Sequence, residues 1–161
     1  GLTENERAQF MPNRIEHDGF VASRVMPFTI TSGLRPKRAP ADFEVQKRER
    51  EWSNQLGGFE STAYLVLRHK HTEPAYDGEF HDVFPTKGVF KCAGCGLPVY
   101  SAASKFDSDD IDGWPVFGQV IFSRARGCHV GVVVDSDGRR LEVICNRCGG
   151  HLGHVTREAE H

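Results

Sequence analysis

Two Cys-x-x-Cys motifs, each followed by glycine, are the residues of this chain best suited to chemistry. The first runs from Cys92 to Cys95 and the second from Cys145 to Cys148. Four thiolates in two such turns form the tetrahedral shell that structural zinc prefers, so we predict a structural Zn2+ ion bound by all four. Two redox or disulfide pairs are the alternative. A redox Cys-x-x-Cys normally opens a helix, however, whereas these glycines suit tight turns.

The fifth cysteine, Cys128, is left over for thiol chemistry. It lies between Arg126 and His129, and neighbouring basic groups can lower the pKa of a thiol. Adjacent residues of a strand point to opposite faces, so His129 need not touch Cys128. An ordinary free cysteine is the default interpretation, and a catalytic Cys128 is the alternative.

The bulk composition indicates a globular protein with no obvious charged partner. Of the 161 residues, 39% are hydrophobic and 26% are charged, and the net charge is −2. This balance indicates neither nucleic-acid nor membrane binding, and the sequence contains no stretch long enough to span a bilayer. Cysteines spaced for zinc favour an intracellular, reducing compartment. The chain starts at Gly1, which removal of a targeting peptide or trimming of the sequence would explain; the mitochondrion is thus one candidate compartment.

Residues 1–43 are expected to form an N-terminal arm ahead of a domain that spans residues 44–161. Four prolines interrupt any long helix in this arm, and the arm also contains Phe10, Phe20, Val25 and Phe28. Such an apolar content is too high for a solvated tail. We expect the arm to pack on its own domain or on a protein partner, which makes a larger complex the predicted setting.

Two short helices and then a series of strands are predicted for the domain. A helical face over residues 43–56 stops at Gly57, and a second helix starts at Ser61 and ends before Pro74. Strands are expected at Val89–Cys92, Leu97–Tyr100, Val116–Phe122, Val130–Val134 and Leu141–Cys145, the last of them half-buried. The interval between the two cysteine motifs is much longer than the roughly 12 to 20 residues of a single zinc finger. The prediction is thus a mainly β, antiparallel domain in which zinc joins two hairpins.

Further motifs lie in a fixed order around the cysteines: Tyr64 to Pro74, Lys105-Phe106-Asp107-Ser108, Gly113-Trp114-Pro115-Val116-Phe117, Arg140-Leu141-Glu142-Val143 and His151-Leu152-Gly153-His154-Val155. With this order, residues 49 to 155 resemble methionine-R-sulfoxide reductase B, the SelR domain family. The resemblance implies a β-tent-like fold of two antiparallel sheets, with zinc distant from the reaction centre. It also implies reduction of the R epimer of methionine sulfoxide, in which a cysteine thiolate attacks sulfur, methionine leaves and a sulfenic acid remains.

The resemblance also implies a pocket formed by Trp114, His151 and His154. The indole would provide an apolar wall for the substrate methyl group, and the histidines would donate protons or hydrogen bonds to the sulfoxide oxygen. The alternatives are that Trp114 is a core residue and that the histidines either support the metal site from outside its ligand shell or face solvent. Arg140 would orient a neighbour in the pocket or face water. Zinc ligation by the histidines is not expected, because four cysteines already close the shell.

The chain departs from the family pattern at the thiols. The family's nucleophilic cysteine follows the second histidine on a final strand, but this chain ends at His161 without one, and Glu158 matches the family's acidic residue only by distance. Asp112 occupies the position where many members have a recycling cysteine. We therefore expect a non-catalytic pseudoenzyme that acts as a structural or interaction subunit. The alternatives are an incomplete copy of an active peptide-methionine (R)-S-oxide reductase, and a zinc-bearing β-tent module that binds ligands through an aromatic pocket.

Overall fold

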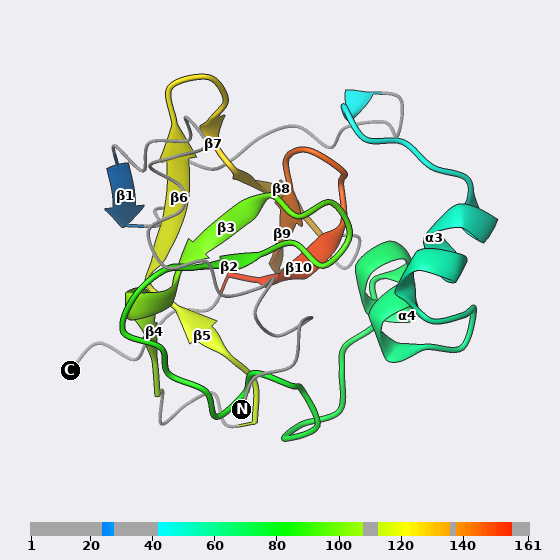
Figure 1. The fold of residues 1–161 in the computed structure, drawn as a ribbon, viewed down its shortest axis with the longest axis horizontal. Coiled ribbons are helices and arrows are strands. Elements are labelled where there is room, and N and C mark those ends of the chain that lie inside the picture. The colour runs from blue at the N-terminus through cyan, green and yellow to red at the C-terminus, as the bar shows by residue number, and fades with distance from the viewer. Residues whose placement is uncertain (1–23, 28–41, 108–112, 136–137, 156–161) are drawn as a thin grey trace.

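The computed structural model describes residues 24–27, 42–107, 113–135 and 138–155, and these residues form one short strand, two helices and then a series of short strands (Figure 1). The helices are α3 (Glu49–Leu56) and α4 (Thr62–His69). The strands are β1 (Arg24–Pro27), β2 (Val89–Lys91), β3 (Pro98–Ser101), β4 (Lys105–Phe106), β5 (Val116–Phe117), β6 (Gln119–Ser123), β7 (Gly127–Cys128), β8 (Val130–Val134), β9 (Leu141–Cys145) and β10 (His151–His154). A 3₁₀ turn at Ala102–Ser104 separates β3 from β4.

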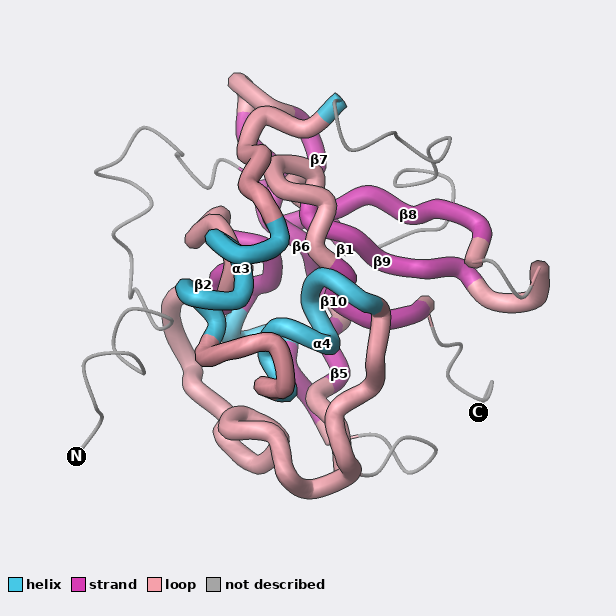
Figure 2. The backbone as a smooth tube through the Cα atoms, turned by 90° about the vertical axis from the view of Figure 1, so that its right-hand side faces the viewer, coloured by secondary structure: helices cyan, strands magenta, loops and turns pink. Residues whose placement is uncertain are grey.

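The strands form antiparallel sheets. One sheet has the order β1-β6-β3-β2, with β7 also paired to β6, and a second has the order β10-β9-β8. The pair β4-β5 stands apart from both. Figures 1 and 2 show both helices at one side of the sheets, with α4 next to β10. The predicted mainly β fold with antiparallel sheets and short helices at its N-terminal side is confirmed.

Helix α3 is shorter than predicted, because the segment before it bonds to the second cysteine motif. The amide of Val45 donates to the carbonyl oxygen of Arg147 at 3.0 Å, so this segment is extended rather than helical. The ring of Phe43 packs with Val133 and Ile144 in a small buried cluster. The helix itself begins at Glu49, buries Trp52 and ends at Gly57, whose φ of 102° suits a glycine.

Helix α4 begins where the sequence predicted. The hydroxyl oxygen of Ser61 accepts a hydrogen bond from the amide of Tyr64 at 3.1 Å, which satisfies one of the free amides of the first turn. Tyr64 and Leu67 are buried against the main core. The helix ends at Lys70, which has a left-handed backbone with φ 57° and ψ 35°. Lysine rarely adopts this conformation, and the strain points to a role for its side chain.

The prediction of one strand over Val116–Phe122 is wrong. The chain passes from one sheet to another at Gly118, whose amide donates to the carbonyl oxygen of Ser104 at 3.0 Å. Before that point β5 pairs with β4, and after it β6 pairs with β3 and β1. The apolar residues are continuous in sequence, but those before Gly118 belong to the β4-β5 pair and those after it belong to the larger sheet.

Strand β9 is buried on both faces, not half-buried as expected. Glu142 and Ile144, predicted to face away from the core, are 5% and 7% exposed. Lys70 reaches Glu142 from the end of α4, and Phe43 and Val133 cover Ile144. The other face belongs to the main core, where Val143 and Cys145 pack with Trp52. The segments that cover the second face come from far along the chain, so alternation within the strand gave no sign of them.

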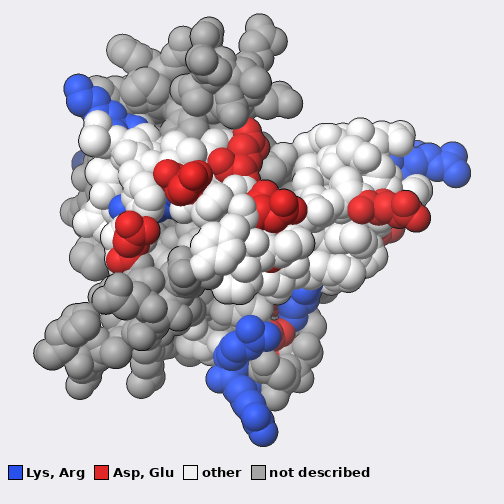
Figure 3. Space-filling view, turned by 90° about the horizontal axis from the view of Figure 1, so that it is seen from below, with Lys and Arg blue, Asp and Glu red and all other residues white. Residues whose placement is uncertain are grey.

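Only part of the predicted arm lies among the described residues. Strand β1 pairs with β6 in antiparallel register, Arg24 opposite Phe122, so this part of the arm adds a strand to its own domain. Residues 1–23 and 28–41 of the arm fall outside the described ranges, as do Asp112 and Glu158, whereas Phe43 at its end is buried in the domain. Neither helix of the described ranges combines the length and apolar character needed to cross a bilayer. On the face drawn in Figure 3, Lys and Arg side chains are scattered and form no continuous basic patch.

Candidate functional site

The four cysteines of the two motifs come together at one point, as predicted. Their sulfur atoms all lie within 4.8 Å of one another. Two of the separations are 3.7 Å, between Cys92 and Cys148, and 3.5 Å, between Cys95 and Cys145. A tetrahedral ion with metal–sulfur bonds of about 2.3 Å requires sulfur atoms roughly 3.8 Å apart. The cluster therefore has the size and the ligands to hold a metal ion.

The backbone of each motif forms the same tight turn. The amide of Gly96 donates to the Cys92 carbonyl at 2.8 Å, and the amide of Gly149 donates to the Cys145 carbonyl at 2.8 Å. Both glycines have φ 76°, a left-handed conformation that other residues adopt at a cost. A side chain at Gly149 would also meet the ring of Phe43 at 2.7 Å. The motifs are turns rather than helix starts, which argues against the redox alternative.

Both helices hold the two turns in place. The guanidinium of Arg68 in α4 donates to the carbonyl of Cys148 at 3.0 Å and stacks 4.2 Å above the ring of Trp52. The side-chain amide of Gln55 in α3 donates to the carbonyl oxygen of Gly94 at 2.6 Å. Arg147 donates to the carbonyl of Cys95 across the cluster. These contacts fix the orientation of the cysteines before any ion binds, which is the usual task of groups outside the ligand shell.

The four thiols cannot ionise independently of one another. Hydrogen bonds from the neighbouring thiols raise the pKa of Cys92 and of Cys145, and burial adds to the effect. Hydrogen bonds within the same group lower the pKa of Cys95 and of Cys148. A divalent cation removes this conflict, because it stabilises all four thiolates together.

Cys128 lies apart from this cluster in the hydrophobic core. It is 8% exposed, and its carbonyl accepts a hydrogen bond from Asn146 at 2.8 Å. The adjacent His129 is fully buried, with Nδ1 2.7 Å from the carbonyl of Pro98 and Nε2 2.7 Å from the hydroxyl of Ser123. Burial lowers the pKa of His129, which favours the neutral ring. These partners give His129 a structural role and favour the ordinary interpretation of Cys128.

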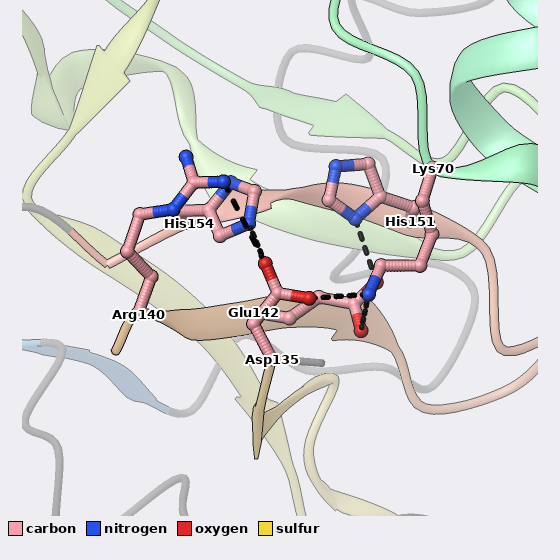
Figure 4. A network of polar contacts seen from close by, with 6 residues as sticks. All are labelled: Lys70, Asp135, Arg140, Glu142, His151 and His154. Carbon is pink, nitrogen blue, oxygen red and sulfur yellow. Dashed lines mark hydrogen bonds and ion pairs between the residues drawn. The ribbon is translucent and has the colours of Figure 1, made fainter. Parts of the chain in front are cut away.

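The two predicted pocket histidines lie together on β10. Their ring centroids are 5.2 Å apart, and the rings are inclined at 65°. His151 Nδ1 lies 2.7 Å from a carboxylate oxygen of Glu142, and His154 Nε2 lies 2.7 Å from a carboxylate oxygen of Asp135 (Figure 4). A register shift between His151 and Gly153 allows both side chains to serve this group. The histidines are therefore paired with carboxylates, which rules out the solvent-facing alternative.

Lys70 joins the two carboxylates. Its Nζ lies 2.5 Å from Asp135 and 3.4 Å from Glu142. The hydrogen bond to Asp135 and the nearby Glu142 raise the pKa of Lys70 despite its partial burial. Burial alone would raise the pKa of Glu142, but the His151 hydrogen bond and the Lys70 charge outweigh it and lower that pKa. Arg140 lies 3.7 Å from Asp135 with a side chain 59% exposed, so it faces both this network and water.

Sequence reasoning missed Lys70 and Asp135 and gave no role to Glu142. Lys70 follows a helix, and Asp135 lies in a turn-rich stretch, where charged residues are ordinary. Glu142 alternates with apolar residues in β9, which suggested the solvent face. These three residues become recognisable only when the fold brings their charged groups next to the two histidines.

Trp114 packs against the segment that follows α4. Its indole N–H donates to the carbonyl of Glu73 at 2.8 Å, and the amide of Tyr76 donates to the carbonyl of Gly113 at 2.8 Å. The side chain is partly exposed, at 37%, so the fully buried core alternative does not hold. Its role as an apolar wall for a substrate methyl group stays a prediction.

Comparison with known families agrees with this arrangement. The family model described as the SelR domain matches residues 59–161, which is more than half of the chain. The chain belongs to the SelR family. The match contains both cysteine turns, Trp114 and the two histidines of this SelR domain, and it leaves α3 and the predicted arm outside.

Relatives of this SelR domain carry the name peptide methionine sulfoxide reductase. This chain is 42% identical over 111 residues to the chloroplastic B3 protein of Oryza sativa subsp. japonica. It is 43% identical over 111 residues to the chloroplastic B2 protein of Arabidopsis thaliana. These matches cover 69% of this chain but only 44% and 50% of the two relatives, so the chain spans about half of their length. The B5 protein of Arabidopsis thaliana is 41% identical over 117 residues, which cover 73% of this chain and 76% of that protein.

Proposed function

We propose that this SelR domain is a zinc-stapled sulfoxide-binding scaffold, and that its 161 residues do not by themselves reduce methionine (R)-sulfoxide. The family and the paired histidines support a pocket for the sulfoxide oxygen. Within the larger protein or complex, the domain would act as a structural or interaction subunit. The names of its relatives make a peptide with an oxidised methionine the expected ligand.

The placement of the five cysteines carries the proposal. Reduction requires a thiolate that attacks the sulfoxide sulfur and becomes a sulfenic acid. Four thiols are held in the cluster, and Cys128 on β7 is buried in the main hydrophobic core, whereas the histidines lie on β10 in the other main sheet. Hydrogen-bond donors alone can bind the oxygen, but they cannot supply the two electrons of the reduction.

Zinc is the metal that the site favours. Four cysteine ligands in a closed, buried shell are typical of structural zinc, which requires no open coordination position. Such thiolates persist in a reducing environment, so the proposal includes a reducing compartment inside the cell, with the mitochondrion as the candidate. Two of the relatives are named as chloroplastic, and this name describes the location of those proteins alone.

A turnover assay tests the proposed lack of activity. The zinc-loaded 161-residue chain, incubated with a peptide that contains methionine (R)-sulfoxide and with dithiothreitol, should produce no methionine above the rate without protein. The same chain should bind the sulfoxide peptide more tightly than the matching methionine peptide, because only the sulfoxide oxygen accepts a hydrogen bond from the histidines. Catalytic turnover would overturn the proposal.

The second candidate is that these residues form part of an active peptide-methionine (R)-S-oxide reductase. The presence of Trp114 and of the carboxylate-paired His151 and His154 favours it, since a purely structural subunit has no need of all three. The mass of the native protein in its source cells distinguishes the two. A longer native polypeptide that reduces the R epimer would establish the second candidate.

The arm of residues 1–43 is proposed to carry the protein–protein contact. Its apolar content exceeds that of a solvated tail, and β1 shows that one part of it can add to a sheet edge. Deletion of residues 1–23, which spares β1 and the buried Phe43, should abolish association with a protein partner, measured by sedimentation at equal protein concentration, and should leave the metal content at one ion per chain. Unchanged association after the deletion would remove this part of the proposal.

A further inference from the structure

The side chain of Lys70 lies at the centre of the histidine network. Each carboxylate of the network has one oxygen near Lys70 and the other near a histidine: Asp135 joins Lys70 to His154, and Glu142 joins Lys70 to His151. Figure 4 shows the Lys70 amine between the two carboxylates. One cation is thus connected to two imidazole rings, each through a single carboxylate.

The carboxylates determine which nitrogen of each ring carries a proton. An ionised carboxylate can only accept, so His151 donates through Nδ1 and His154 donates through Nε2. The two rings are therefore held as opposite tautomers. The nitrogens left for a ligand are Nε2 of His151 and Nδ1 of His154.

The charge of Lys70 compensates the two carboxylates that the rings also contact. Asp135 and Glu142 are buried, at 8% and 5% exposure, and two buried carboxylates require compensating positive charge. Lys70 supplies one such charge from α4, and Arg140 approaches Asp135 with a side chain that is mostly in water. Without Lys70, the two carboxylates would lose the cation that they share, and the imidazole rings are the other groups that contact them directly.

The backbone of Lys70 supports a specific role. Its left-handed conformation at the end of α4 is one that glycine and asparagine adopt easily and lysine does not. In this conformation the side chain reaches Asp135, just after β8, and Glu142 in β9. A residue kept in a strained conformation where a better one exists is consistent with a function of its side chain.

We propose that Lys70 is a positioning residue for the sulfoxide pocket, which through Asp135 and Glu142 fixes the tautomer and the single protonation of His154 and His151. The inference rests on the proposed function, since that function assigns the two histidines to the sulfoxide oxygen. A singly protonated ring can donate to the oxygen and also take up a proton, whereas a doubly protonated ring can only donate.

Imidazole ¹⁵N spectra of the zinc-loaded chain at pH 7.5 test the assignment. The wild type should show the Nδ1–H form at His151 and the Nε2–H form at His154. Lys70→Asn removes the charge, and asparagine tolerates the left-handed backbone conformation of this position. It should raise the ratio of doubly to singly protonated ring at least about tenfold for both histidines. Lys70→Arg, which keeps the charge, should retain the wild-type pattern.

Lys70→Gly provides a second uncharged variant with an unstrained backbone, in case the asparagine variant does not fold. Unchanged ring signals in either folded uncharged variant would overturn the assignment. Addition of N-acetylmethionine (R)-sulfoxide methylamide to the wild type tests the proposed function separately. If the signals of His151 and His154 do not move on addition of this ligand, the proposed sulfoxide pocket is rejected, but the proposed effect of Lys70 on the two rings is not.

Discussion

Removal of the metal ion should unfold this domain. The four cysteine ligands come from two separate turns, which also anchor both helices. Structural zinc contributes about 10–16 kcal/mol in small zinc-binding peptides, and whole domains are stable by only about 5–15 kcal/mol. Urea unfolding followed by circular dichroism should show a cooperative transition for the zinc-loaded chain and none after treatment with a strong chelator. Cys145→Ser should behave like the chelated protein.

Cys128→Ser is the matched control, because it makes the same substitution at a buried cysteine outside the cluster. A hydroxyl group in this part of the core should cost about 1–3 kcal/mol and leave one metal ion per chain. Equal stability of Cys145→Ser and Cys128→Ser, or a chelated protein that unfolds like the untreated one, would contradict the role of the metal.

Glu142→Ala should produce the second large loss, about 3–5 kcal/mol in the free energy of unfolding. The substitution leaves His151 buried at 4% exposure without its carboxylate, and it removes one of the two partners of Lys70. Breaking one side of a buried ion pair costs this much because the remaining charge or dipole stays out of water. Urea unfolding at pH 7.5 measures the loss.

The control for Glu142 is Glu51→Ala, which removes a carboxylate from an exposed pair. Glu51 lies 3.4 Å from Arg48, and its side chain is 54% exposed. Exposed pairs contribute about 0–1 kcal/mol, so this substitution should be close to neutral. A cost for Glu142→Ala as small as that for Glu51→Ala would mean that the buried network does not hold β9 and β10 together.

The stability that Glu142 contributes should depend on pH in a defined direction. Its pKa in the folded protein is lowered from the ordinary value of 4.5. The contribution is therefore fully present above pH 4.5, and it is lost as the pH falls through the lowered value. Acid also protonates the metal-bound thiolates, so the informative quantity is the stability difference between wild type and Glu142→Gln. This difference should shrink below pH 4.5, and a difference that grows would contradict the assigned direction.

The sequence was sufficient to predict the features that local spacing encodes. The cysteine cluster was predictable because four cysteines in two glycine-bounded turns have few uses other than metal binding. The start of α4 followed from Ser61, β8 followed from its apolar run, and β9 followed from an alternating pattern. These features depend on residues close together in the chain, or on ligands whose chemistry brings them together.

The remainder depended on contacts between distant segments. The extended path before α3 depends on a hydrogen bond from Val45 to Arg147, and the break at Gly118 depends on one to Ser104. The burial of Glu142 depends on Lys70, which is far from it in sequence. No periodicity within a strand reports such partners, so the histidines were predictable as a pair while the groups that orient them were not.

The most direct test of the central claim is a single-turnover measurement without reductant. On this account four thiols bind the metal ion and the core encloses the fifth, so no thiol is available to attack a sulfoxide. The zinc-loaded 161-residue chain is mixed with one equivalent of a methionine (R)-sulfoxide peptide. Methionine is then quantified, and the protein is probed with dimedone for sulfenic acid. We predict no methionine and no dimedone adduct. One equivalent of methionine per chain with an adduct on Cys128, or on any cluster cysteine, would contradict the claim.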